Sequence, residues 1–223
     1  MKSITGRSDG SARLFLVKRS RTLLNFSHWP WVNGGGDIFA DDVVLRTNSI
    51  KEVYVNVALY VSGFRPAFVQ MLNSLSAILD KAKAHARDRE IDPKVLLNYR
   101  LAPDMLPFVR QIQIAADLAK GAAARLAGVE VPKHDDTEKT FADLTARLAK
   151  TVAFVQSFNP SDIDGSEDRD ISLKLGEHML SFKGQPYLVH FACPTFISIA
   201  PTAYDILRHC GVELGKRDFI GTI

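Results

Sequence analysis

The amino-acid sequence predicts an all-α protein, an up-down four-helix bundle with a small β-hairpin inserted before the last helix. Three observations predict this fold. Apolar residues recur at helical spacing in three long stretches, a fourth helical stretch near the C-terminus is interrupted by prolines, and a short segment before it alternates apolar and polar residues. The composition of 46% hydrophobic and 24% charged residues is typical of a globular protein, and 223 residues suffice for one domain with an extension.

The first helix is expected to begin near Gly63 and to end before Asp92. Its inner face carries Phe64, Phe68, Met71, Leu72, Leu75, Ile78, Leu79 and Ala82. Asp92 followed by Pro93 is a helix-start signal, so a short helical turn is expected through Leu97.

The second long helix is expected to open at Pro103–Asp104 and to end at Gly128, a residue suited to the C-terminal cap. Its stretch 115–127 is rich in alanine, whose short side chain lets a neighbouring helix approach closely. A third helix is expected after a cap at 135–137. Its inner stripe is Phe141, Leu144, Leu148, Val152 and Val155, and Asn159–Pro160 ends it.

The hairpin is predicted where Ile171, Leu173 and Leu175 alternate with polar residues and Gly176 supplies a turn. Pro186 then opens the last helix.

This last helix is expected to reach about His209, with Gly211 as its cap. Pro194 and Pro201 lie within it, so we expect a kink or a break.

Residues 1–56 show no sustained helical period and contain both tryptophans and a run of three glycines. We predict that 1–56 is a poorly ordered N-terminal extension and that 57–223 forms the bundle. The alternatives for the extension are an upstream start in the gene model and a mitochondrial transit peptide, which its Arg- and Ser-bearing part resembles.

The charge distribution and the two cysteines indicate which cell compartment and which classes of partner to expect. The first 50 residues carry seven Lys or Arg and four Asp, which leaves 21 basic and 21 acidic residues elsewhere, so no nucleic-acid partner is expected. Cys193 and Cys210 would lie about 25 Å apart on one helix, too far for a disulfide, which fits a reducing cytoplasm. No apolar run approaches the roughly 18 residues of a membrane-spanning helix, so we expect a soluble, cytoplasmic protein without a membrane partner.

The candidate binding residues lie on the second and last long helices. Tyr187, His190 and Cys193 are three residues apart and so share a helix face, while Gln113 and Asp117 lie one turn apart on the partner helix. We take His190, Gln113, Asp117 and Tyr187 as candidate ligand-binding residues. The alternative is that these polar groups are hydrogen-bonded inside the bundle.

The remaining signals for chemistry are weak. Asp205 and His209 form a possible second pair, although a histidine at a helix end is also favoured by the helix dipole. His28, His85, His134 and His178 fit surface or structural positions. No nucleophile elbow, zinc-protease motif or dinucleotide fingerprint occurs, so no catalytic residue is assigned and enzymatic activity stays open.

Three segments, NSLSAILDKAKAHA (73–86), LAPDMLPFVRQIQIAADLAKGAAARLAGVE (101–130) and TAYDILRHCGVELGKRDFIG (202–221), resemble the domain-of-unknown-function family nineteen-ninety-three. This family lies near the DinB/YfiT-like metalloenzymes, and the resemblance covers 57–223. It implies a DinB-like four-helix bundle and a homodimer.

The resemblance also implies what a metal site would need. Metal-binding relatives use one histidine on the second helix and two on the last helix at HxxxH spacing. Here the second long helix has no histidine, Pro194 follows His190 by four residues, and Ile199 is apolar. Only His190 carries over, so we predict no intact three-histidine site and no cofactor.

The resulting hypothesis is a small-molecule-binding or stress-associated accessory protein, homodimeric and cytoplasmic. The alternative is a metal-dependent transferase or hydrolase with a divergent site of His190, Gln113 and Asp117, joined by Asp205 or His209. A third possibility is a structural module that makes a homodimer.

Overall fold

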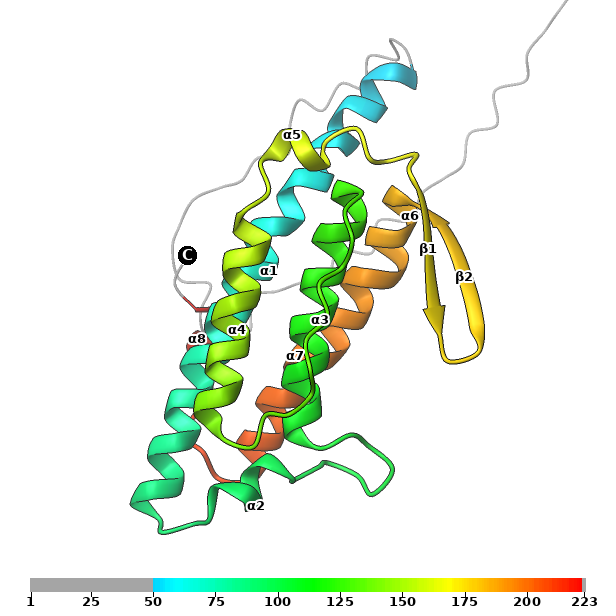
Figure 1. Ribbon diagram of the computed structural model, residues 1–223. Helices are drawn as coiled ribbons and strands as arrows, with labels where there is room; N and C mark the ends of the chain where they lie inside the picture. Colours follow the sequence, from blue (N-terminus) through cyan, green and yellow to red (C-terminus); the bar gives the residue numbers. More distant parts are fainter. Residues whose placement is uncertain (1–49, 222–223) are drawn as a thin grey trace, which may run out of the picture. The chain divides into compact units, whose positions relative to one another are not determined.

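Four long helices pack side by side in the computed structural model, which describes the backbone of residues 50–221 and the side chains of 63–221 (Figure 1). They are α1 (Ile50–Asp88), α3 (Phe108–Ala127), α4 (Phe141–Gln156) and α7 (Cys193–His209). Helix α1 packs against α4, α4 against α3, and α3 against α7. The all-α bundle with a hairpin before the last helix is therefore confirmed.

The short elements lie at the ends and edges of the bundle. They are α2 (Pro93–Leu97), α5 (Pro160–Ile163), β1 (Asp170–Leu175), β2 (His178–Lys183), α6 (Gly184–Tyr187) and α8 (Lys216–Ile220). By the contacts within each part, the chain divides into two units, 1–46 and 47–223. The predicted boundary at residue 57 falls inside α1, and the predicted extension lies outside the described residues as far as residue 49.

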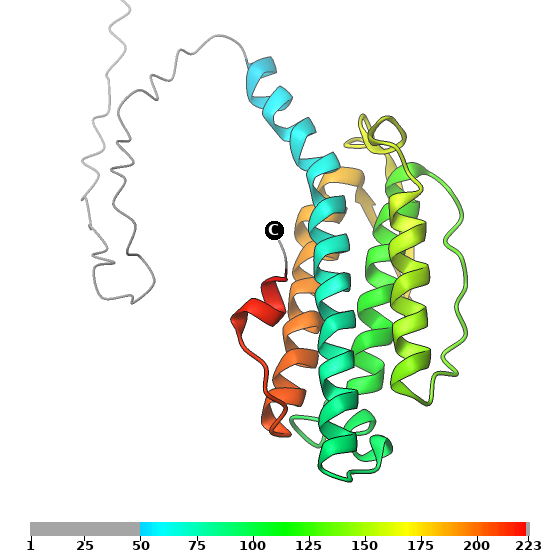
Figure 2. The ribbon, with the colours of Figure 1, turned by 90° about the vertical axis from the view of Figure 1, so that its left-hand side faces the viewer.

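The helix order departs from the expected up-down order at one place: α3 and α4 run in the same direction, and the connection 128–140 returns along them (Figure 2). The 20 residues of α3 rise about 30 Å. The connection 128–140 spans about 40 Å when fully extended, so it can reach back to the start of α4. We call 128–140 the return segment.

Three helix starts differ clearly from the expected positions. Helix α1 begins at Ile50 and not near Gly63. Helix α3 begins at Phe108, after Pro107, and not at Pro103–Asp104; the N–H of Phe108 donates to the carbonyl of Tyr99 at 2.8 Å instead. Helix α4 is capped by Thr140 and not by 135–137. The Thr140 hydroxyl accepts from the N–H of Asp143 at 3.1 Å, and the Asp143 carboxylate accepts from the N–H of Thr140 at 3.0 Å.

Several local predictions are confirmed. Asp92 caps α2 through the N–H of Lys94, and Gly128 ends α3 with a φ of +72°. The strands pair antiparallel with Ile171 opposite Phe182 and Leu173 opposite Leu180. Ile171 and Leu173 are buried, whereas Leu175 at the hairpin tip is exposed.

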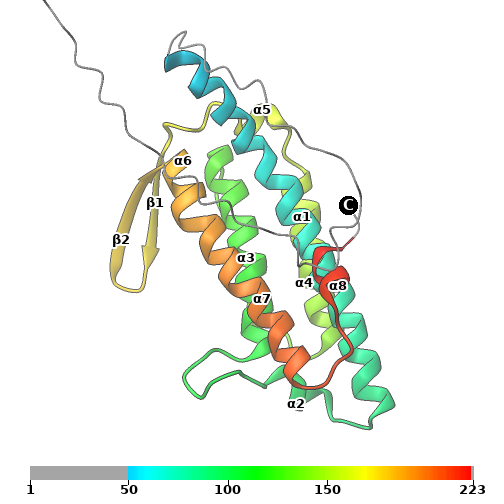
Figure 3. The ribbon, with the colours of Figure 1, turned by 180° about the vertical axis from the view of Figure 1, so that it is seen from behind.

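The last helix is continuous from Gly184 to His209 and not broken, but it is irregular next to Pro194. It begins as α6, widens to a π-helical turn at Leu188–Ala192, and continues as α7, which has Pro194 in its first turn (Figure 3). A wider turn accommodates the proline ring, which lacks an N–H and would clash with the preceding turn. Pro201 lies inside α7 without ending it.

The core lies between the four long helices. The rings of Phe68 on α1 and Phe196 on α7 are 4.6 Å apart at their centroids. On α3 the small residues Ala115, Ala116, Ala119, Ala122 and Ala123 are fully buried, as the alanine-rich pattern predicted. None of the described helices is long and apolar enough to cross a membrane.

Candidate functional site

Arg147 on α4 is the centre of the densest polar cluster among the described side chains. Its side chain is 2% exposed. Its Nη2 donates to Oδ2 of Asp117 on α3 at 2.9 Å, and its Nη1 donates to Oε1 of Glu138 at 2.9 Å and lies 3.0 Å from Oδ1 of Asp136. One guanidinium thus ties α4 to α3 and to the return segment.

Gln113 extends this cluster, since its Nε2 donates to Oε2 of Glu138 at 2.7 Å and its Oε1 accepts from Arg110 Nη1 at 2.7 Å. Lys120 adds an ion pair to Asp117 at 2.8 Å. We call the seven residues the Arg147 network; they are Arg110, Gln113, Asp117, Lys120, Asp136, Glu138 and Arg147. The structure therefore brings the sequence-predicted candidates Gln113 and Asp117 together.

The charges in the Arg147 network compensate one another. Burial by itself would raise the pKa of Asp136 and of Glu138. Hydrogen bonds and charges outweigh burial and lower both values, from Arg110 and Arg147 at Asp136, and from Arg147, Gln113 and the backbone at Glu138. The same carboxylates raise the pKa of Arg147 against the effect of its own burial. Because each charge is held by a partner, the network positions the return segment and offers no nucleophile.

His134 lies beside the network on the return segment. Its Nδ1 is buried without a hydrogen-bond partner among the described residues. Burial and the nearby charges of Lys120, Lys150 and Arg147 lower the pKa of His134, so its neutral form is favoured.

Tyr187 and His190 lie away from the Arg147 network. The Tyr187 side chain is buried, and its hydroxyl accepts from Nη1 of Arg125 at 3.1 Å. Arg125 follows Asp117 by eight residues on α3, which places them about 12 Å apart along the helix. His190 is exposed on the π-helical turn. The four candidate residues therefore lie at three separate places: Gln113 and Asp117 in the Arg147 network, Tyr187 beside Arg125, and His190 on the exposed π-helical turn.

The residues present do not fit the metal site that the family resemblance implies. Among the side chains of 63–221, no three His, Cys, Asp or Glu are placed to hold a metal ion. Asp205 and His209 are both exposed near the end of α7. Cys193 and Cys210 are free thiols, and burial raises the pKa of each.

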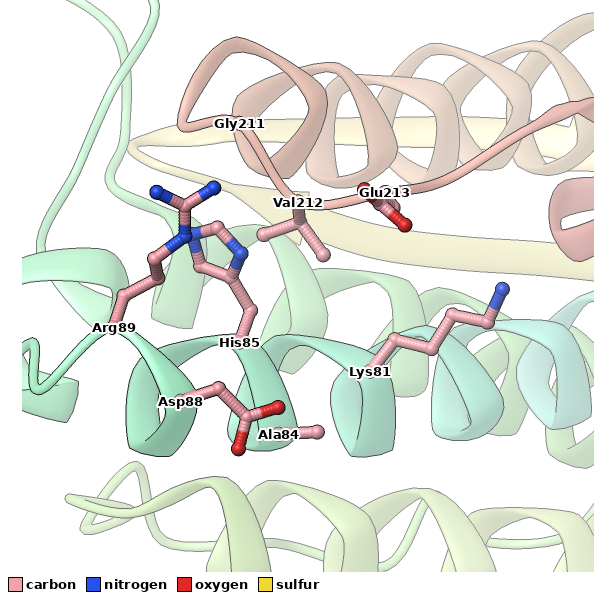
Figure 4. A pocket seen from close by; sticks show the side chains of 8 residues that line it. All are labelled: Lys81, Ala84, His85, Asp88, Arg89, Gly211, Val212 and Glu213. Carbon is pink, nitrogen blue, oxygen red and sulfur yellow. The ribbon is translucent and has the colours of Figure 1, made fainter.

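A groove that the sequence did not indicate lies between the end of α1 and the segment after α7 (Figure 4). It has a volume of about 370 Å³, and we call it the α1 groove. Its lining residues are Lys81, Ala84, His85, Asp88, Arg89, Gly211, Val212 and Glu213.

The α1 groove has a charged rim. Val212 is 2% exposed, and Ala84 lies on the face of α1 that carries Asp88 (Figure 4). Figure 4 shows His85 and Arg89 extending from α1 toward the segment 211–213, while Asp88 points away from it. His85 was predicted to fit a surface position because Lys81, Lys83 and Arg87 surround it in the sequence. The sequence did not indicate the groove because residues 211–213 lie more than a hundred positions away.

Comparisons with known proteins identify a matching family and a solved structure with a similar fold. A family model described as a domain of unknown function, DUF1993, matches residues 60–220. A crystal structure of a DinB family member protein from Shewanella denitrificans is 39% identical, with a TM-score of 0.69, and the match covers 74% of this chain and 96% of that one. A comparison with curated proteins finds no match. The first two results confirm the resemblance and the DinB-like bundle.

Proposed function

The chain belongs to the DUF1993 family of domains of unknown function, and from that premise we propose that it is a small-molecule-binding accessory protein whose ligand occupies the α1 groove. The observation that carries this proposal is the groove itself. Its volume of about 370 Å³ lies within the ~300–1,000 Å³ of small-molecule sites, and charged side chains that could orient a ligand line a partly apolar surface.

The alternative is a metal-dependent transferase or hydrolase around His190. A metal centre of that kind needs three or four converging ligands. Gln113 and Asp117 are engaged in the Arg147 network, and Tyr187 is hydrogen-bonded to Arg125. These contacts support the ligand-binding proposal over the alternative.

The test combines elemental analysis with ligand screening on the full chain without a histidine tag. We expect metal-free protein after dialysis and a rise in melting temperature with members of a metabolite library. Arg89→Met should abolish that rise, because Arg89 lines the groove. Arg87→Met is the matched control, since Arg87 lies on the same turn of α1, is not a lining residue of the groove, and among the side chains of 63–221 forms an ion pair only with Asp88.

Two results would overturn the proposal. About one zinc, nickel or iron per chain, lost in His190→Ala, would establish the metal-dependent alternative. Protein that ignores the whole library but dissociates into poorly folded monomers on dilution would establish the structural module instead.

We also propose that the protein is a cytoplasmic homodimer with a role under stress. The free thiols Cys193 and Cys210 are compatible with a reducing compartment. Light scattering across a concentration series measures the oligomeric state. Cell fractionation, and growth of a deletion strain under oxidative and chemical stress, test the location and the role.

A further inference from the structure

The two walls of the α1 groove carry opposite charge. Helix α1 supplies Lys81, His85 and Arg89 on one wall, and the segment after α7 supplies Glu213 on the other. Figure 4 shows both sets of side chains at the same opening. A ligand lying across the groove would therefore meet basic groups at one end and a carboxylate at the other.

Some of the charges at the rim already have partners. Lys81 pairs with Asp218 at 2.7 Å, and Asp88 pairs with Arg87 at 2.8 Å. Within residues 63–221, by contrast, the side chains of His85, Arg89 and Glu213 make neither an ion pair nor a hydrogen bond. The groups left for a ligand are two basic side chains on α1 and one acid opposite.

The wall that carries Glu213 is formed by backbone contacts and so exists before a ligand binds. Gly211 has a φ of +85°, a conformation that suits glycine, and it turns the chain after α7. The N–H of Val212 donates to the carbonyl of Leu207 at 3.0 Å, and Arg208 Nη1 donates to the carbonyl of Leu214 at 2.7 Å. Glu213 is held between these two anchored residues.

Between the walls, Val212 is only 2% exposed and is already packed, and Ala84 lies on the face of α1 that carries Asp88 (Figure 4). The groove thus faces the basic side chains of α1 with an acidic side chain on the opposite wall.

From this order of groups we propose that the α1 groove binds a small zwitterion of the ω-amino acid type. Its carboxylate lies at Arg89 and His85, its ammonium group lies at Glu213, and its methylene chain spans the distance between them. This inference rests on the proposed function and names the ligand class of the same site.

Calorimetry with a series of simple probes tests it. The series is glycine, β-alanine, γ-aminobutyrate, 5-aminopentanoate and 6-aminohexanoate, with butanoate and butylamine as probes that carry one charge each. We expect one chain length to bind about tenfold or more tighter than either single-charge probe, because two charge-assisted contacts form only with the zwitterion.

Variants separate the two ends of the ligand. Glu213→Gln should bring the best zwitterion down to the affinity of butanoate, and Arg89→Gln should weaken it about tenfold. Both residues are exposed, so neither change threatens folding. Glu177→Gln in the hairpin turn is the matched control and should change nothing.

The outcomes distinguish this inference from the proposed function. If library ligands bind in an Arg89-dependent way but Glu213→Gln has no effect, or butanoate binds as tightly as every zwitterion, the zwitterion inference is wrong and the binding function stands. If neither the library nor the probe series binds, both are wrong.

Discussion

Arg147 on α4 and Asp117 on α3 meet through a 2.9 Å hydrogen bond between Nη2 and Oδ2, and this contact ties together two neighbouring helices that run in the same direction. Parallel neighbours cannot be joined by a short turn, so the return segment must run back along them. Asp136 and Glu138 on that segment bind the same guanidinium. The Arg147–Asp117 pair is therefore part of the network of ion pairs and hydrogen bonds that holds the return segment against α3 and α4.

Removing the guanidinium should destabilise the bundle. Arg147→Met leaves Glu138 and Asp117 without their shared cation, and breaking a fully buried pair costs about 3–5 kcal/mol. Asp117 and Asp136 are 43% and 38% exposed, so solvent screening reduces the expected loss to about 2–3 kcal/mol. Urea denaturation measures it.

The control for this change is Arg87→Met, which removes an exposed pair with Asp88. It should leave the free energy of unfolding unchanged, because both side chains are exposed to solvent. Equal effects of the two substitutions would contradict the role given to the Arg147 network.

Stability should fall in mild acid because of His134. The folded-state pKa of His134 lies below its ordinary value of 6.5, so at intermediate pH the unfolded chain holds more protons than the folded one. Its contribution to stability is full above about pH 6.5 and is lost as the pH falls from 6.5 toward the folded-state pKa. Denaturation midpoints from pH 8 to pH 5 measure this loss.

Two comparisons isolate His134. His134→Gln should flatten the profile between pH 7 and 5, whereas His178→Gln on the exposed strand β2 should not. Asp136 and Glu138, whose pKa values are lowered, contribute a separate loss at lower pH, because their stabilisation is present above their ordinary values of 3.8 and 4.5 and disappears below them. A profile unchanged by His134→Gln would refute the assignment.

Gly184, at the start of α6, is required by a close backbone approach. A Cβ at this position would overlap the carbonyl oxygen of Ser166, which is main chain and cannot rotate away. Gly184→Ala is therefore expected to cost about 2–3 kcal/mol of stability. Thermal and urea unfolding provide the measurement.

Gly63 provides the matched position for that substitution. It lies in α1 with nothing within 4 Å of an added Cβ, so Gly63→Ala should be neutral or stabilise the helix by up to about 1 kcal/mol. A loss at Gly63 equal to that at Gly184 would mean that the approach to Ser166 is not the cause.

The two thiols should be slow to react. Burial raises the pKa of Cys193 and of Cys210, so little thiolate is present at neutral pH. We expect a disulfide reagent such as DTNB to label both cysteines more slowly in the native protein than in urea. Rapid native labelling of either one, followed by mass spectrometry, would identify an activated thiol that this structure does not account for.

Much of the fold is predictable because the signals are local. Asp92 with Pro93, Gly128 and the alternation at 171–173 each act through neighbours within a few residues, and all three predictions are confirmed. The start of α4 was predicted wrongly because Asp135, Asp136 and Thr137 are all residue types that cap helices. In the structure Asp136 is engaged with Arg110 and Arg147, and Thr140 forms the cap.

The sequence by itself determined the helical stripes, the caps at Asp92 and Gly128, the hairpin and the family, because periodicity and turn chemistry depend on short stretches of chain. The tertiary structure alone decided that α3 and α4 are parallel, that Gln113 and Asp117 join Arg147, and that His85 faces Val212 and Glu213. Each of these relationships joins residues 30 to more than 120 positions apart. Such pairings arise from how the helices pack, and the spacing of residues along the chain carries no record of them.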